Sequence, residues 1–260
     1  MDSFLAAIAC RSADAEPYDV RAVREALADV DTGFELRGTG LTSVPDNLNL
    51  SFSRPREVDL AGNRLTSLPE DLLAAGCALK SLSACRNALT ALPACISAAH
   101  IQKLYLQHNR LTSLPADLPH GLVLLDASSN ALAGEVTLAG APTLQKVRVA
   151  NNAITALTLG ALTEQLASGS GVPMLASVDA SANALSEVPG SLLGEASVLT
   201  SLRLAGNRLA SLPQPLALCP RLLELDLSDN RLSTLPASLD GLVSLRKLLL
   251  QRNELTAIPG

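Results

Sequence analysis

The sequence predicts an α/β solenoid, with parallel strands on the concave face of a curved horseshoe and short helical or irregular returns on the convex face. Three observations predict it. One pattern, L-x-x-L-x-L-x-x-N-x-L-x-x-L-P, recurs along nearly the whole chain after residue 31. Its copies follow one another at 21 to 24 residues, with one interval of 31, and a fixed period of this length is typical of solenoids. The segment before the repeats has a different, helical pattern, as a terminal cap would.

A single repeat is clearest at residues 56–69. We number the fifteen positions of the pattern as slots 1 to 15, and residues 56–69 fill slots 2 to 15. Val58 and Leu60, in slots 4 and 6, are expected to point inward, because alternate side chains of a strand share a face. The slot-9 asparagine is expected inside the coil, where its amide pairs with backbone groups of its own turn and of the neighbouring repeat. Thr39 takes slot 9 in a degenerate copy, and nine asparagines take it elsewhere: Asn63, Asn87, Asn109, Asn130, Asn152, Asn183, Asn207, Asn230 and Asn253.

The returns between strands vary more than the strands do. A proline at slot 15, such as Pro69, suits the start of a short helical return. The longest interval, from Asn152 to Asn183, suggests a helical segment at 161–167 and a Ser-Gly turn at 168–171 that bulge from the convex side or an edge. Two irregular copies, at 115–119 and 132–136, are interpreted as drift.

Two regions follow from this pattern. Residues 1–30 are predicted to be an N-terminal helical cap, because Val20, Val23 and Leu27 lie on one side at helical spacing. Residues 31–260 are predicted to be the repeat domain, with about ten repeats and the last one incomplete. The incomplete repeat favours a truncated chain over an open end covered by a partner or by a second copy.

The repeats resemble leucine-rich repeats, and the L-P ending resembles intracellular proteins of the Shoc-2/Ras-group-related type. The opening segments 32–36 (TGFEL) and 40–45 (GLTSVP) are similar to the start of leucine-rich repeat-containing proteins 57 and 40. The resemblance implies a cytosolic interaction protein. Some shorter relatives begin Met-Gly and carry a lipid there, but Asp2 implies no such anchor in this chain.

Composition and charge exclude several classes of function. The five cysteines form no C-x-x-C pair and no cysteine-rich cap, which favours a reducing, cytoplasmic location. The longest apolar runs are far short of the roughly 20 residues that span a bilayer. A net charge of −5 argues against nucleic-acid binding. No catalytic motif appears and the three histidines lack metal-ligand spacing, so no enzyme activity, cofactor or metal is expected.

Slot 5 should project from the middle of the sheet and form a column across it. The column reads Glu35, Asp59, Ser83, Tyr105, Asp126, Arg148, Asp179, Arg203, Asp226 and Leu249. Its alternating charges from Asp126 to Asp226 predict ion pairs between strands about 4.8 Å apart. They form either a self-satisfied ladder or a docking surface for a partner of mixed charge.

A second candidate patch combines an aromatic side chain with cations. It consists of Arg86, Lys103, Tyr105, Gln107 and His108, which would suit an acidic or phosphorylated segment, or form a chance cluster on a solvated sheet. With Asp126, Arg148 and Arg203 from the column, these are the candidate protein-binding residues. The expected function is a non-enzymatic scaffold or adaptor. The alternatives are the recognition arm of a larger kinase, GTPase or ubiquitin-ligase effector, or a regulatory subunit of a phosphatase or Ras-pathway enzyme.

Overall fold

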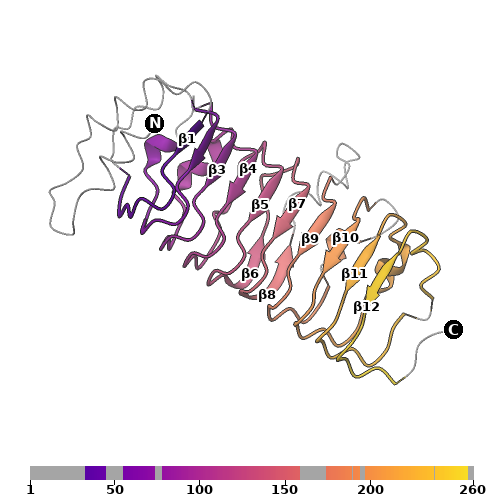
Figure 1. Cartoon of the computed structure of the whole chain (residues 1–260). Coiled ribbons are helices and arrows are strands. Elements are labelled where there is room, and N and C mark those ends of the chain that lie inside the picture. Colours follow the sequence, from indigo (N-terminus) through magenta and orange to yellow (C-terminus); the bar gives the residue numbers. More distant parts are fainter. Residues whose placement is uncertain are drawn as a thin grey trace.

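The chain forms an elongated solenoid whose largest feature is a ten-stranded parallel sheet along one side (Figure 1). The computed structural model describes residues 33–44, 55–73, 78–158, 174–188, 190–193, 197–236 and 238–256. In spatial order the strands are β1 (Gly33–Glu35), β2 (Glu57–Asp59), β3 (Ser81–Ser83), β4 (Lys103–Tyr105), β5 (Leu124–Asp126), β7 (Lys146–Arg148), β9 (Ser177–Asp179), β10 (Ser201–Arg203), β11 (Glu224–Asp226) and β12 (Lys247–Leu249). The predicted cap at 1–30 and the insertion at 161–171 lie outside the described residues.

The core is a continuous column of leucines between the sheet and the returns. Slots 4 and 6 point inward as the pattern predicts, and Leu202, Leu204 and Leu227 are completely buried. Among the described residues β12 has a neighbouring strand on one side only. Its inward Leu248 is 38% exposed, whereas the equivalent Leu225 of β11 is 2% exposed.

The described returns contain 3-10 helices and no α-helix, so the described part of the chain is a β-solenoid. The 3-10 helices are η1 (Glu70–Leu72), η2 (Ala94–Ala98), η3 (Gly190–Leu192) and η4 (Gln214–Leu218). An extended proline precedes three of them: Pro69, Pro93 and Pro213. A 3-10 turn rises about 2.0 Å per residue against about 1.5 Å in an α-helix, so it covers the width of the coil with fewer residues. No described helix has both the length and the hydropathy that crossing a bilayer requires.

Two returns are strands, which corrects the interpretation of residues 132–136 as drift. β6 (Ala133–Thr137) and β8 (Ala153–Thr158) pair in parallel and form a second, two-stranded sheet. Gly134 has a φ of 73° beside a register shift, a conformation that glycine adopts at little cost. Val136 stands where other repeats have the slot-15 proline, and the hydroxyl of the next residue, Thr137, lies 3.0 Å from that of Thr158 across the strand pair. The altered sequence therefore encodes a different return.

Candidate functional site

The slot-9 asparagines link consecutive repeats, and Asn207 shows how. Its Nδ2 donates to the carbonyls of Leu204 in its own turn (2.9 Å) and Ala180 in the preceding repeat (3.0 Å). Its Oδ1 accepts from the backbone N–H of Leu185 at 3.0 Å. All nine slot asparagines accept and donate in this way. In the degenerate repeat, the hydroxyl of Thr39 donates either to the carbonyl of Leu36 at 3.1 Å or to Oδ1 of Asn63 at 3.0 Å.

Slot 8, just before each asparagine, is left-handed in all ten repeats. Three repeats place glycine there and seven place another residue, with φ between 52° and 69° at Gly38, Gly62, Arg86, His108, Ser129, Asn151, Ala182, Gly206, Asp229 and Arg252. This conformation costs most residues other than glycine about 1–2 kcal/mol. The fixed backbone holds the side chains of Arg86 and His108 at the rim of the sheet in adjacent repeats.

The slot-5 column has the predicted register, with Glu35, Asp59, Ser83 and Tyr105 on neighbouring strands and the other members following in order. The aspartates of this column also accept hydrogen bonds from the backbone of the turn that follows each strand. Asp126 accepts a hydrogen bond from the backbone N–H of Ser128 at 3.2 Å, and Asp226 accepts one from Ser228 at 3.1 Å. Asp59 and Asp179 accept equivalent bonds from the residue two positions later. The aspartates therefore stabilise the turn that leads into slot 8.

The predicted ladder of ion pairs along this column is wrong in its C-terminal part. Arg148 does pair with Asp126, with 3.5 Å between Nη1 and Oδ2. Arg203 instead contacts Glu224 at 2.9 Å, and Lys247 contacts the other oxygen of Glu224 at 2.8 Å. Glu224 lies in slot 3, so its pair with Arg203 runs diagonally between the two outward columns, whereas Lys247 lies directly beside Glu224 in slot 3. The pKa of Glu224 is lowered, first by the hydrogen bond from Lys247 and second by the hydrogen bond from Arg203. The hydrogen bond with Glu224 raises the pKa of Arg203.

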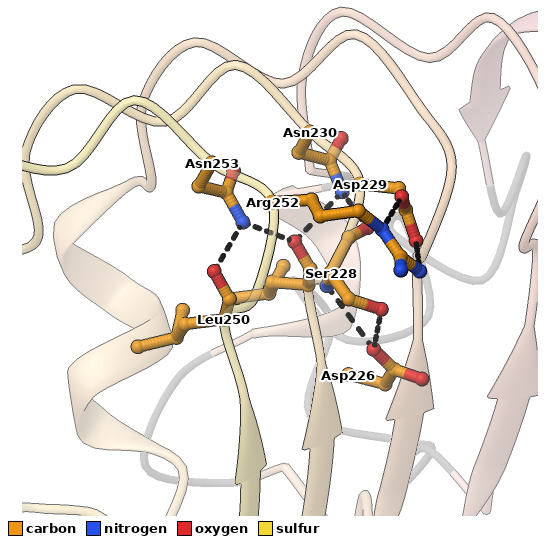
Figure 2. Close-up of polar contacts among 8 residues, drawn as sticks. Asp226, Ser228, Asp229, Asn230, Leu250, Arg252 and Asn253 are labelled. Carbon is orange, nitrogen blue, oxygen red and sulfur yellow. Dashed lines mark hydrogen bonds and ion pairs between the residues drawn. The ribbon is translucent and has the colours of Figure 1, made fainter.

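The same self-pairing continues at the rim of the last repeats, as Figure 2 shows. Arg252 reaches Asp229 through both Nε and Nη2, the second contact at 2.7 Å. The hydroxyl and N–H of Ser228 both meet Asp226, and Asn230 and Asn253 hold the turns behind them. The hydrogen bonds from Arg252 lower the pKa of Asp229. The charges of β10–β12 are thus largely neutralised within the protein.

The predicted patch on β4 and the neighbouring turns has a different character. Lys103, Arg86 and His108 are exposed and Tyr105 is half-buried. Arg86 and Gln107 lie side by side, since the Arg86 N–H donates to the Gln107 carbonyl at 2.9 Å. Among the described residues no ion pair engages Lys103 or Arg86.

Gln107 and Asp126 were expected to be exposed contact residues, but both are more buried than expected. The Oε1 of Gln107 is buried without a hydrogen-bond partner in the described part of the chain. Asp126 is only 7% exposed, because its carboxylate faces the turn at Ser128 and is covered by Arg148. Of the slot-3 column, sequence reasoning named Lys103 but missed Lys146 and Glu224, which lie on the same face. Period-two alternation from slot 5 would have identified it.

No metal centre is found in the described ranges, since no group of three or more His, Cys, Asp or Glu side chains converges there. The three histidines are all exposed and lie in different repeats.

Comparisons with known proteins agree with this geometry. A family model described as Leucine rich repeat matches residues 197–255, and one described as Leucine Rich Repeat matches 100–122. No curated protein matches the chain in sequence.

Three solved structures resemble it, each with a TM-score of 0.63. An LRR protein of Leptospira interrogans is 24% identical over 94% of this chain and 72% of its own. TLR13 in complex with ssRNA13 is 23% identical, and PEPR1 with AtPEP1 is 27% identical. The matches cover 81% and 85% of this chain but only 31% and 30% of those two proteins.

Proposed function

Because the chain is a leucine-rich repeat protein, we propose that it acts as a non-enzymatic protein-interaction module, a cytoplasmic scaffold or adaptor that binds its partner through the sheet face. Leucine-rich repeat domains are typically interaction modules, and this one presents a preformed sheet. A surface that is already ordered loses less conformational entropy on binding than a flexible segment does. The L-P ending shared with Shoc-2/Ras-group-related proteins supports the intracellular setting.

One observation carries the choice of surface: the two halves of the sheet face use their charges differently. On β10–β12, Arg203, Glu224 and Lys247 satisfy one another. On β3–β4, Arg86 and Lys103 are exposed beside Tyr105 and have no ion pair among the described residues. Charged groups that are not already paired are available to steer and hold a partner, and tyrosine and arginine are enriched at interface hot spots. The patch of Arg86, Lys103, Tyr105, Gln107 and His108 is therefore the proposed contact.

The test is a double variant, Lys103→Ala with Tyr105→Ala. The partner is first identified by pull-down and mass spectrometry, and its affinity is then measured by titration calorimetry. We expect Kd to rise about ten- to thirtyfold, as removing hot-spot residues typically does. The matched control is Arg208→Ala with Arg231→Ala, two exposed rim arginines, with circular dichroism to verify folding. Unchanged affinity in the folded double variant would reject this surface.

A further inference from the structure

Five outward side chains on β4, β5 and β7 form a compact grid. The register places Lys103, Leu124 and Lys146 side by side in slot 3. In slot 5 it places Tyr105, Asp126 and Arg148 side by side. We call five of these side chains the cationic grid: Lys103, Tyr105, Leu124, Lys146 and Arg148. Asp126 lies between them but is left out of the set, because it is only 7% exposed.

The cationic grid has an uncompensated positive charge in a protein of net charge −5. Its three cations have two acidic neighbours by register, Asp126 and Asp179. Asp126 is already engaged by Arg148 and by the N–H of Ser128, and Asp179 accepts from the N–H of Ser181. Lys103 and Lys146 have no ion pair among the described residues. Exposed Lys80 and Arg86 extend the positive charge on the β3 side.

The centre of the grid is apolar. Leu124 and Tyr105 are half-buried and lie diagonally across β4 and β5. Lys103 and Lys146 flank Leu124 two strand spacings apart, which is about 10 Å. An extended chain covers that distance in about three residues. The grid thus alternates a cation, an apolar surface and a second cation along the long axis of the solenoid.

From this arrangement we infer that the cationic grid binds an extended acidic peptide segment of the partner protein. Carboxylates of the segment contact Lys103 and Lys146, and an aliphatic side chain between them covers Leu124 and Tyr105. The inference rests on the proposed function and specifies the chemistry of its partner. Arg148 remains with Asp126, where it keeps the floor of the grid electrically neutral.

A peptide fits the grid better than a single-stranded nucleic acid does. Binding of single strands relies on several aromatic platforms for successive bases as well as on positive charge. Tyr105 is the only aromatic side chain at the outward positions of the ten strands. The aliphatic centre at Leu124 suits a branched apolar side chain instead.

The experiment measures fluorescence anisotropy of labelled probes with the full 260-residue chain. The probes are a twelve-residue peptide of four Glu-Glu-Leu units, the same peptide with Gln for Glu, and a twelve-nucleotide single-stranded oligouridine RNA. The variant is Lys103→Gln with Lys146→Gln. Its matched control is Arg208→Gln with Arg231→Gln, which removes the same charge from exposed side chains off the sheet face.

We expect the acidic peptide to bind the wild type, with Kd rising about tenfold in the grid variant and less than twofold in the control, since two ion-pair contacts are lost. We expect Gln peptide and RNA to bind at least tenfold more weakly than the acidic peptide. Equal losses in both variants, equal binding of the Gln peptide, or tighter binding of RNA would each overturn the inference. If the partner still depends on Tyr105 while the acidic peptide does not bind, the inference fails and the proposed function stands.

Discussion

The residue that holds this molecule together is the slot-9 asparagine. Its amide lies between two turns and satisfies backbone groups of both, so every turn depends on the repeat before it. Asn207 is 7% exposed, and its amide group donates to carbonyls on both sides of the repeat junction. An aspartate has nearly the same shape but no N–H to donate, which makes the substitution a sensitive test of this link.

We expect Asn207→Asp to lower the free energy of unfolding by about 2–4 kcal/mol, because at least two buried carbonyls lose their donor and a carboxylate takes its place. Urea denaturation at pH 7 provides the measurement. Asn253→Asp is the matched control, because Asn253 makes the same kinds of bond but is half-buried. Its loss should be smaller, and equal losses would contradict the dependence on burial.

The left-handed slot 8 gives a second prediction at the residue scale. Ala182 and Gly206 occupy it in consecutive repeats, with φ of 52° and 67°. Ala182→Gly should raise the free energy of unfolding by about 0.5–1 kcal/mol, because glycine adopts this conformation without steric cost. Gly206→Ala should lower it by about 1 kcal/mol. Its Cβ would meet Ala182 at an ordinary 3.5 Å, so crowding does not confuse the comparison. Thermal melts of both variants should shift in opposite directions, and a shared direction would refute the argument.

At the scale of the element, β10, β11 and β12 are joined by the carboxylate of Glu224. Its pKa is lowered by hydrogen bonds from Lys247 and Arg203. A lowered pKa in the folded state adds stability that is present above the ordinary value of 4.5 and is lost as the pH falls through the folded value.

We therefore expect Glu224→Gln to lower the free energy of unfolding at pH 7 by about 1 kcal/mol, a modest figure because Arg203 and Lys247 are half-exposed. The deficit should shrink as the pH falls below 4.5, where the wild type loses the same interaction. Denaturant melts from pH 7 to pH 3 measure it. Glu187→Gln, at an exposed carboxylate without an ion pair among the described residues, is the control. A deficit that stays constant with pH would rule out this origin.

At the scale of the whole molecule, the repeating period made most of the sheet predictable. A strand has period two and the repeats have a nearly constant length, so slot 5 of each strand follows from the position of its asparagine. Tyr105 and Asp126 therefore lie side by side as expected. The choice of ionic partner could not be predicted in this way, because Arg203 reaches either outward column and selects Glu224 over its two neighbouring aspartates.

Repeats that depart from the common pattern were the second feature that the sequence did not predict. The copy at 132–136 lacks the proline that starts a 3-10 turn, and its backbone pairs with the next return to form β6 and β8. Reading it as drift assumed that a weakened pattern carries no information. Asp126 was expected to face solvent but is turned toward the N–H of Ser128, a local bond that alternation alone does not reveal.

The stacking of repeats also determines how far the effect of a destabilising substitution extends along the solenoid. Each strand of the large sheet pairs only with its neighbours, so the array should open locally and not as a single unit. Leu202→Ala removes a completely buried side chain from β10 and should cost about 2–5 kcal/mol. Leu248→Ala on β12 should cost less, because that side chain is already 38% exposed. Hydrogen exchange read by mass spectrometry should show faster exchange in β9–β11 of the first variant while β1–β3 keep their protection. Equal acceleration in β1–β3 would mean that the ten strands unfold as one cooperative unit.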